Sequence, residues 1–122
     1  MNIEQIRAYC LNKRGATEDF PFDEDTLVFK VLGKMFALIS FKWWESGEAA
    51  INVKCDPDYA QELRTEYNSI RPGYHMNKKH WNTLHLYEGE LNTKFILKLI
   101  DHSYDMVVKG MTKKMRDTLL DL

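Results

Sequence analysis

Residues 26–41 have the sequence TLVFKVLGKMFALISF, and this stretch decides the fold class of the chain. Two runs of branched and aromatic residues, 26–32 and 35–41, meet at Gly33-Lys34, a pair compatible with a type II′ turn. The pattern predicts a β-hairpin. Further strands are predicted at 50–55, at 74–76 and at 81–87. Strands linked by hairpins favour an antiparallel sheet.

Helices are predicted around this sheet from start and stop signals. Asn2 and Gln5 form a capping box ahead of a first helix that ends near Gly15. Asp56-Pro57 is a typical helix start. Residues 92–109 repeat apolar side chains every three or four positions and predict the longest helix, and 112–120 predict a short last one. These few helices can cover only one face of the sheet. The sequence therefore predicts an α/β fold of the α+β type, with one face of the sheet left open and a single domain over residues 1–122.

Composition bounds the function of this chain. Its 122 residues are 44% hydrophobic and carry a formal net charge of -1, which suits a packed core and excludes a strongly cationic nucleic-acid binder. No apolar run approaches the roughly 20 residues of a membrane span, and the first residues lack a signal-peptide pattern. Cys10 and Cys55 have no metal-type spacing. We therefore expect a cytoplasmic protein with two reduced, buried thiols and no membrane partner.

The face of the sheet without helices follows from the alternation of side chains along each strand. The apolar sets, such as Leu27, Phe29 and Val31, are expected to face the helices. Residues 35–41 are apolar on both parities and cannot be oriented. The uncovered face is expected to carry cations and aromatic rings and no carboxylate: Lys30, Asn52, Lys54, Trp81, Thr83 and His85. Such a face is either a solvated surface or a binding surface.

A basic and aromatic segment spans residues 71–85, which contain no acidic residue. Cations can meet phosphates and rings can stack on unpaired bases, so the segment suits nucleic acid, although a solvated loop has the same composition. The acidic residues gather instead at 18–25, where carboxylates could hold a cation or simply form a solvated loop. Phosphate-binding, zinc-protease and nucleophile motifs are absent. We expect no catalytic activity, no cofactor and no metal site.

Five motifs carry a resemblance to a known family. They are EDFPFD at 18–23, FKV at 29–31 with MFAL at 35–38, VKCDP at 53–57, RPGYHMNKKHWNT at 71–83, and LIDHSYDMVV at 99–108. With these motifs the chain resembles the MmcQ/YjbR family of small bacterial proteins over roughly residues 1–115. The resemblance implies a CyaY-like fold and DNA binding. The CyaY-like fold is shared with frataxins, but the acids here follow the first helix, which disfavours iron binding of the frataxin type.

Two functional hypotheses follow. The first is a non-catalytic DNA-binding protein, in which Trp81 or Tyr74 stacks on or wedges between bases. Its expected contact residues are Lys34, Arg71, Tyr74, His75, Asn77, Lys78, Lys79, His80 and Trp81. The second is a domain that binds a protein or a small ligand on the uncovered face, with Trp43, Trp44 and Trp81 as aromatic anchors.

Overall fold

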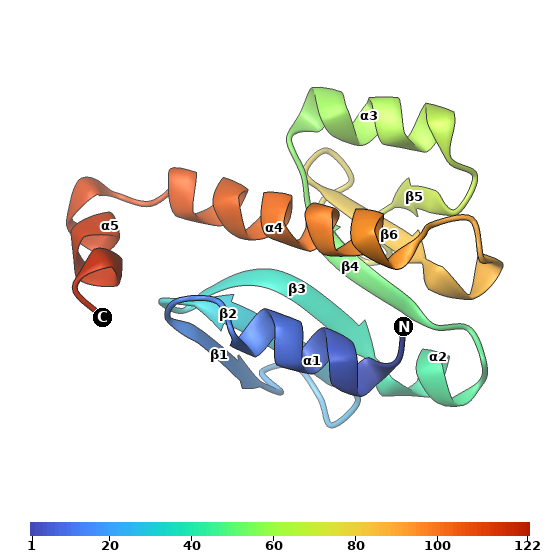
Figure 1. The fold of residues 1–122 in the computed structure, drawn as a ribbon, viewed down its shortest axis with the longest axis horizontal. Helices are drawn as coiled ribbons and strands as arrows, with labels where there is room; N and C mark the ends of the chain where they lie inside the picture. Colours follow the sequence, from blue (N-terminus) through green and yellow to red (C-terminus); the bar gives the residue numbers. More distant parts are fainter.

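The computed structural model describes residues 1–122 and contains five α-helices and one six-stranded sheet (Figure 1). The helices are α1 (Ile3–Leu11), α2 (Phe41–Glu45), α3 (Pro57–Glu66), α4 (Thr93–Lys109) and α5 (Lys113–Leu120), and Leu86–Glu88 form the 3₁₀ turn η1. The strands are β1 (Ala16–Asp19), β2 (Thr26–Val31), β3 (Lys34–Ser40), β4 (Ala50–Lys54), β5 (Ile70–Pro72) and β6 (Trp81–His85).

The strands lie in the order β1-β2-β3-β4-β6-β5, and every neighbouring pair is antiparallel. Helices α1, α3 and α4 pack over one face of this sheet (Figure 1). The predicted fold class, an antiparallel sheet with helices on one face, is confirmed. We call the opposite side the helix-free face.

The helix starts follow the local signals in the sequence. The Asn2 side chain accepts a hydrogen bond from the Gln5 amide at 2.8 Å, and the Gln5 side chain accepts one from the Asn2 amide, which completes the capping box. Asp56 caps α3 with a single bond, accepting from the Tyr59 amide at 3.1 Å, and Pro57 is the first residue of that helix. These caps satisfy amide groups that the helix itself leaves without partners.

One cluster of 22 buried residues fills the space between the helices and the sheet. Leu27, Phe29 and Val31 belong to it, as the alternation along β2 predicted. Strand β3 could not be oriented because Phe36 and Ala37, although adjacent, both join this cluster. Phe29 pairs with Ala37 and Lys30 pairs with Met35, so Phe36 is an extra residue of β3 with no partner in β2. This β-bulge interrupts the alternation of side chains, and Phe36 and Ala37 therefore face the same side of the sheet.

Ser103 of α4 ties the helix layer to the centre of the sheet. The ladder between β3 and β4 is short and ends at Ala37 and Val53. Beyond it, the buried Ser103 hydroxyl donates to the Phe36 carbonyl at 2.5 Å and accepts from the Lys54 amide at 2.7 Å. The side chain therefore satisfies two backbone groups at the point where the strands stop pairing with each other.

The hairpin of β2 and β3 is confirmed, but its turn lies one residue earlier than predicted. Val31 pairs with Lys34, which leaves Leu32 and Gly33 as the two turn residues. Both have positive φ, 48° and 80°, as a type I′ turn requires. The twist of the paired strands thus imposes a left-handed conformation on Leu32, which a local preference for glycine does not anticipate.

Three short elements differ from the predictions. The strand predicted at 74–76 is wrong: β5 lies at Ile70–Pro72, and His75 has a φ of 55°, which no extended strand allows. The acidic segment is not wholly a loop, because its first two residues, Glu18 and Asp19, end the edge strand β1. The short helix α2 lies in a segment where the sequence predicted no helix. Each of these elements is held by pairing or packing with distant residues rather than by local propensity.

Candidate functional site

The helix-free face carries a second, small cluster of buried residues, Val28, Leu38 and Trp81, against which Met35 and Met76 pack. Two loops lie beside it. The β5–β6 loop (residues 73–80) contributes Met76, and the β1–β2 loop (residues 20–25) contributes two carboxylates at the edge of the same face. The expectation of a face without carboxylates is therefore wrong, because a loop, and not a strand, supplies them.

Trp81 is a packing residue. Only 8% of its surface is exposed, and its side chain belongs to the small cluster with Val28 and Leu38. A ring covered in this way offers no free face to a nucleobase. The stacking role predicted for Trp81 is therefore wrong, whereas Tyr74, the alternative ring, is 54% exposed.

Two of the cations on this side of the molecule are already paired. The Arg71 guanidinium donates to both oxygens of Glu88, with a shortest contact of 2.6 Å between Nη2 and Oε2. Lys30 lies 3.4 Å from the Asp19 carboxylate. Glu88 stands outside the basic segment in the sequence, so the positive charge of this segment is partly cancelled in the fold, and Asp19 does the same for Lys30 of β2.

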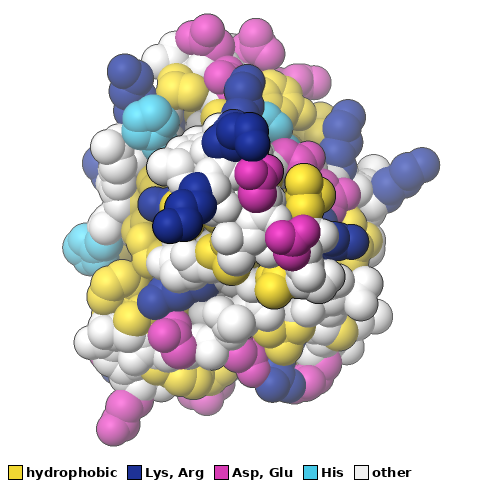
Figure 2. Space-filling model, turned by 90° about the vertical axis from the view of Figure 1, so that its left-hand side faces the viewer, with side chains coloured by type: hydrophobic (Ala, Val, Ile, Leu, Met, Phe, Trp, Pro, Cys, Tyr) yellow, Lys and Arg dark blue, Asp and Glu magenta, His cyan; other side chains and the backbone are white.

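Four lysines without carboxylate partners lie at the same end of the sheet. They are Lys34 at the β2–β3 hairpin, Lys54 at the end of β4, and Lys78 and Lys79 in the β5–β6 loop, and none forms an ion pair. Lys54 pairs with Trp81 in the ladder, which brings the loop beside β4. Figure 2 views this end and shows Lys and Arg side chains across its centre and upper part, with carboxylates between them.

The backbone of the loop that carries Lys78 and Lys79 is held from two sides. Arg64 of α3 donates to the Asn82 side chain at 2.6 Å, to the Trp81 carbonyl at 3.2 Å and to the Lys78 carbonyl. The Asn77 side chain accepts from the Lys79 amide at 2.9 Å, so this predicted contact residue is engaged in the turn itself. The half-buried His80 accepts from the Cys55 amide through its carbonyl.

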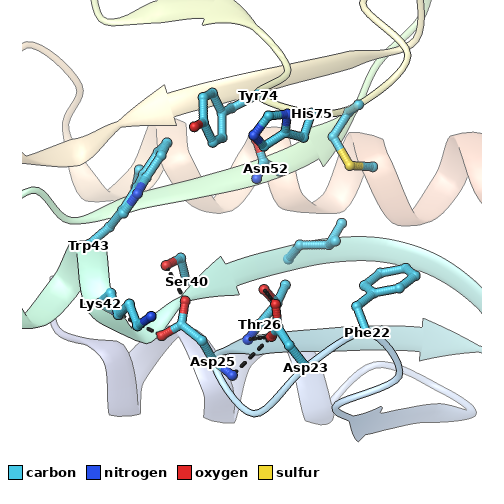
Figure 3. A pocket seen from close by; sticks show the side chains of 13 residues that line it. Phe22, Asp23, Asp25, Thr26, Ser40, Lys42, Trp43, Asn52, Tyr74 and His75 are labelled. Carbon is cyan, nitrogen blue, oxygen red and sulfur yellow. Dashed lines mark hydrogen bonds between the residues drawn. The ribbon is translucent and has the colours of Figure 1, made fainter.

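A pocket of about 460 Å³ opens on the helix-free face between the two loops (Figure 3). Trp43 and Phe22 stand at opposite ends of it, and Tyr74 and His75 lie along one side. Asp23 and Asp25 lie along the other side. The remaining lining residues come from strands, from α2 and from the loops: Thr26, Leu38, Ser40, Lys42, Ala50, Asn52 and Met76.

Aromatic rings form one wall of this pocket. The Trp43 and Tyr74 ring centroids are 5.1 Å apart, and those of Tyr74 and His75 are 4.0 Å apart. Behind them, outside the pocket lining, His85 stacks on Trp43 at 6.1 Å. Burial, with a smaller contribution from the Arg71 charge, lowers the pKa of His85 below its ordinary value, so the ring stays neutral at neutral pH.

The two carboxylates of the opposite wall are each held by two short hydrogen bonds. Asp25 accepts from the Ser40 hydroxyl at 2.6 Å and from the Lys42 amide at 2.8 Å. Asp23 accepts from the amides of Thr26 and Asp25 at 2.7 and 2.9 Å. These amide hydrogen bonds, that of Thr26 first, lower the pKa of Asp23. An ionised carboxylate has about four acceptor positions, so both groups can accept further hydrogen bonds from a ligand.

Asn52 supplies a donor between the two walls. Its side-chain oxygen accepts from the Thr83 hydroxyl, which in turn accepts from the Tyr74 amide at 3.0 Å. This chain fixes the amide so that its nitrogen, which has no partner in the protein, points toward the pocket (Figure 3). Asn52 and Trp43 were singled out from the sequence, but Asp23 and Asp25 were assigned only to an acidic segment, and no local signal places them opposite Tyr74.

The cysteines and histidines give no sign of another reactive centre. Cys10 and Cys55 are both buried free cysteines, as predicted, and burial raises the pKa of each thiol to about 12. No group of three or more His, Cys, Asp or Glu side chains is placed to hold a metal ion. None of the helices is both long and apolar enough to cross a membrane.

The fold and the basic loop define a class of small α+β proteins with a six-stranded antiparallel sheet, and comparisons with known proteins identify the family. The family model described as YjbR matches residues 11–106. The chain is 31% identical to the uncharacterised protein YjbR of Escherichia coli K12, over all of both chains. It is 42% identical to the uncharacterised protein YbdF of E. coli O157:H7 over 96 residues, which cover 78% of this chain and 75% of YbdF. The chain therefore belongs to the YjbR family.

Solved structures agree with this assignment. The crystal structure of protein DR2400 from Deinococcus radiodurans, of the family DUF419, superposes with a TM-score of 0.86 at 38% identity, covering 97% of this chain and 87% of that one. A Pseudomonas syringae crystal structure superposes with a TM-score of 0.72 at 32% identity, covering 87% of this chain and 98% of that one.

Proposed function

We propose that this protein binds nucleic acid through phosphate contacts at the end of the sheet. The observation that carries the proposal is that four lysines without carboxylate partners lie at the same end of the sheet. They are Lys34, Lys54, Lys78 and Lys79, from two strands and one loop. Lysines free of intramolecular ion pairs can release counterions from a phosphate backbone, and this release supplies most of non-specific affinity.

The fixed backbone of the β5–β6 loop supports the same function. Arg64 and the Asn77 turn hold residues 77–81 in place, so little backbone entropy is lost when Lys78 and Lys79 meet phosphates. The proposal makes the protein a non-catalytic binder, because no nucleophile-base pair accompanies the lysines.

The net charge of -1 limits the strength of this binding. Carboxylates lie between the cations in Figure 2, so attraction is local to the lysines and is not a property of the whole surface. If four lysines contact phosphates, the logarithm of the association constant falls with the logarithm of salt concentration with a slope of roughly -3 to -4.

The test is a fluorescence-anisotropy titration of labelled single- and double-stranded oligonucleotides at about 50 and about 200 mM salt, the range over which phosphate contacts lose affinity. The double variant Lys78→Glu/Lys79→Glu is expected to lose affinity by about tenfold or more at the lower salt concentration. The matched control is Lys94→Glu/Lys98→Glu, which changes the net charge equally but lies on α4, over the other face of the sheet.

Unchanged binding in the control and loss in the loop variant support the proposal. Equal loss in the two double variants would show a general charge effect without a site. Absence of binding by the unmodified protein at the lower salt concentration would overturn the proposal outright.

A further inference from the structure

The geometry points to the pocket on the helix-free face as a site for one unpaired nucleobase that carries an exocyclic amine. This inference deepens the proposed function, and in its strand-bound form it rests on that function. The lysines would hold the phosphates, and the pocket would hold a base. One loop connects the two, because the β5–β6 loop supplies both the Tyr74 and His75 wall and Lys78 and Lys79.

The size and lining of the pocket suit a flat ring. Its volume of about 460 Å³ falls in the range of small-molecule sites. Trp43, Tyr74 and His75 offer aromatic surface along one side, and Leu38 and Ala50 add apolar floor. Aromatic side chains of this kind stack on bases, and the interaction tolerates any base because each base has a π-face.

The polar groups then select among bases. Asp23 and Asp25 are acceptors only, so the ligand must present donors on that side. An exocyclic amine is such a donor, as when a carboxylate accepts from the amine of cytosine. Asn52 provides a donor in place of an acceptor. Its side-chain nitrogen, which has no partner in the protein, can donate a hydrogen bond to a ring nitrogen or carbonyl beside that amine. Adenine, cytosine and guanine carry this pair of groups side by side, whereas thymine has no exocyclic amine.

The carboxylates also determine which part of the nucleic acid enters. A phosphate placed between Asp23 and Asp25 would meet two negative charges against the single positive charge of Lys42, so the backbone is expected to stay outside the pocket. Within a duplex the exocyclic amines are paired and the rings are stacked on their neighbours. The site therefore favours unpaired bases, and single strands are expected to bind more tightly than duplexes.

The experiment measures binding of short labelled single strands, each made of one base (cytosine, adenine or thymine), and of a labelled duplex. Each is titrated with the unmodified protein and with two pocket variants. Tyr74→Ala removes a ring from the aromatic wall, and Asp25→Asn removes a negative acceptor while keeping a side chain that can bond Ser40 and the Lys42 amide. Matched controls are Tyr87→Ala and Asp105→Asn, which change exposed residues of the same types outside the pocket.

We expect each pocket variant to weaken binding of the cytosine and adenine strands by about tenfold and to abolish their advantage over thymine. A second arm titrates free cytidine, adenosine and thymidine against the Asn52 side-chain amide signals in an NMR spectrum. Cytidine and adenosine should shift these signals, and thymidine should not. Signals that respond to free nucleosides in a protein that does not bind strands would assign the pocket to nucleosides.

The outcomes separate this inference from the proposed function. If the lysine variants abolish strand binding while all bases bind equally and Tyr74→Ala and Asp25→Asn have no effect, the phosphate site stands and the nucleobase pocket is overturned. If no strand binds but nucleosides shift Asn52, the pocket stands as a nucleoside site and the phosphate-binding proposal fails. If neither strands nor nucleosides bind, both are wrong.

Discussion

The two faces of the sheet use the same strands in different ways. On the helix-covered face, 22 buried residues form one continuous cluster, whereas on the helix-free face only Val28, Leu38 and Trp81 are buried together. The first face stabilises the fold, because burial of apolar surface is the main favourable term in folding. The second face keeps polar and aromatic side chains exposed around a pocket. We therefore expect mutations on the first face to change mainly stability and mutations on the second face to change mainly the proposed binding.

The largest expected effect separates the faces by stability. Phe36→Ala removes a fully buried ring that packs edge-on against Tyr104, and should lower the free energy of unfolding by about 4 kcal/mol. Tyr74→Ala, on the helix-free face, should lower it by less than about 1 kcal/mol, because the side chain is largely exposed. Urea unfolding followed by circular dichroism measures both. Similar losses in the two variants would contradict the separation.

A smaller effect is expected where the helix layer meets the sheet. Ser103→Ala leaves the Phe36 carbonyl and the Lys54 amide without their partner, and should cost about 2 kcal/mol in the same measurement. Ser46→Ala, at an exposed position after α2, is the control and should change stability by less than about 0.5 kcal/mol. A loss no greater than that of the control would show that water replaces the Ser103 hydroxyl.

The pH dependence of stability tests a weaker contact on the helix-covered side. His102 accepts from the Asp56 amide at 3.1 Å, and burial lowers its pKa below the ordinary value of 6.5. The neutral form is favoured in the folded state, so its contribution to stability is present above pH 6.5 and declines as the pH falls below that value. His85 acts in the same direction.

The free energy of unfolding should therefore fall between about pH 7 and about pH 5, above the range in which carboxylates titrate. His102→Gln keeps an acceptor for the Asp56 amide and cannot be protonated, so it should flatten this slope. His75→Gln, at an exposed position, is the control. A slope unchanged by His102→Gln would assign the pH dependence to other groups.

The smallest expected effect concerns the paired cation of the basic segment. Because Glu88 already holds Arg71, Arg71→Ala should change oligonucleotide affinity by less than about twofold. The anisotropy titration measures this directly, with the Lys78 and Lys79 variant as the positive comparison. A loss as large as that of the lysine variant would mean that Arg71 leaves Glu88 when nucleic acid binds.

Much of the fold could be predicted because local signals and long-range packing agree. The capping box at Asn2, the Asp56-Pro57 start and the apolar repeat of 92–109 each specify a helix without help from distant residues. The alternation of Leu27, Phe29 and Val31 identifies the core side of β2. The Phe29/Lys30 bulge and the left-handed Leu32 were not predictable, since both depend on how paired strands twist.

The candidate site was predicted less well, because charge and exposure depend on partners distant in sequence. Lys78 and Lys79 are exposed, as the basic composition of residues 71–85 indicated. In the same segment, however, Arg71 pairs with Glu88, and Trp81 is buried. The carboxylates of the pocket belong to a segment that precedes β2, and the tyrosine opposite them follows β5. No spacing in the sequence announces that these two loops face each other.

By itself, then, the sequence determined the longer helices and the strands β2, β3, β4 and β6, the side of β2 that faces the core, and the resemblance to the YjbR family. Those properties follow from periodicity and capping, which act within a few residues. Only the tertiary structure decided which cations are neutralised, which aromatic ring is buried and where a pocket opens. These properties depend on contacts between residues distant in the sequence, such as Arg71 and Glu88, which are 17 residues apart. They also depend on the strand order, which brings the β1–β2 loop and the β5–β6 loop to one face of the sheet.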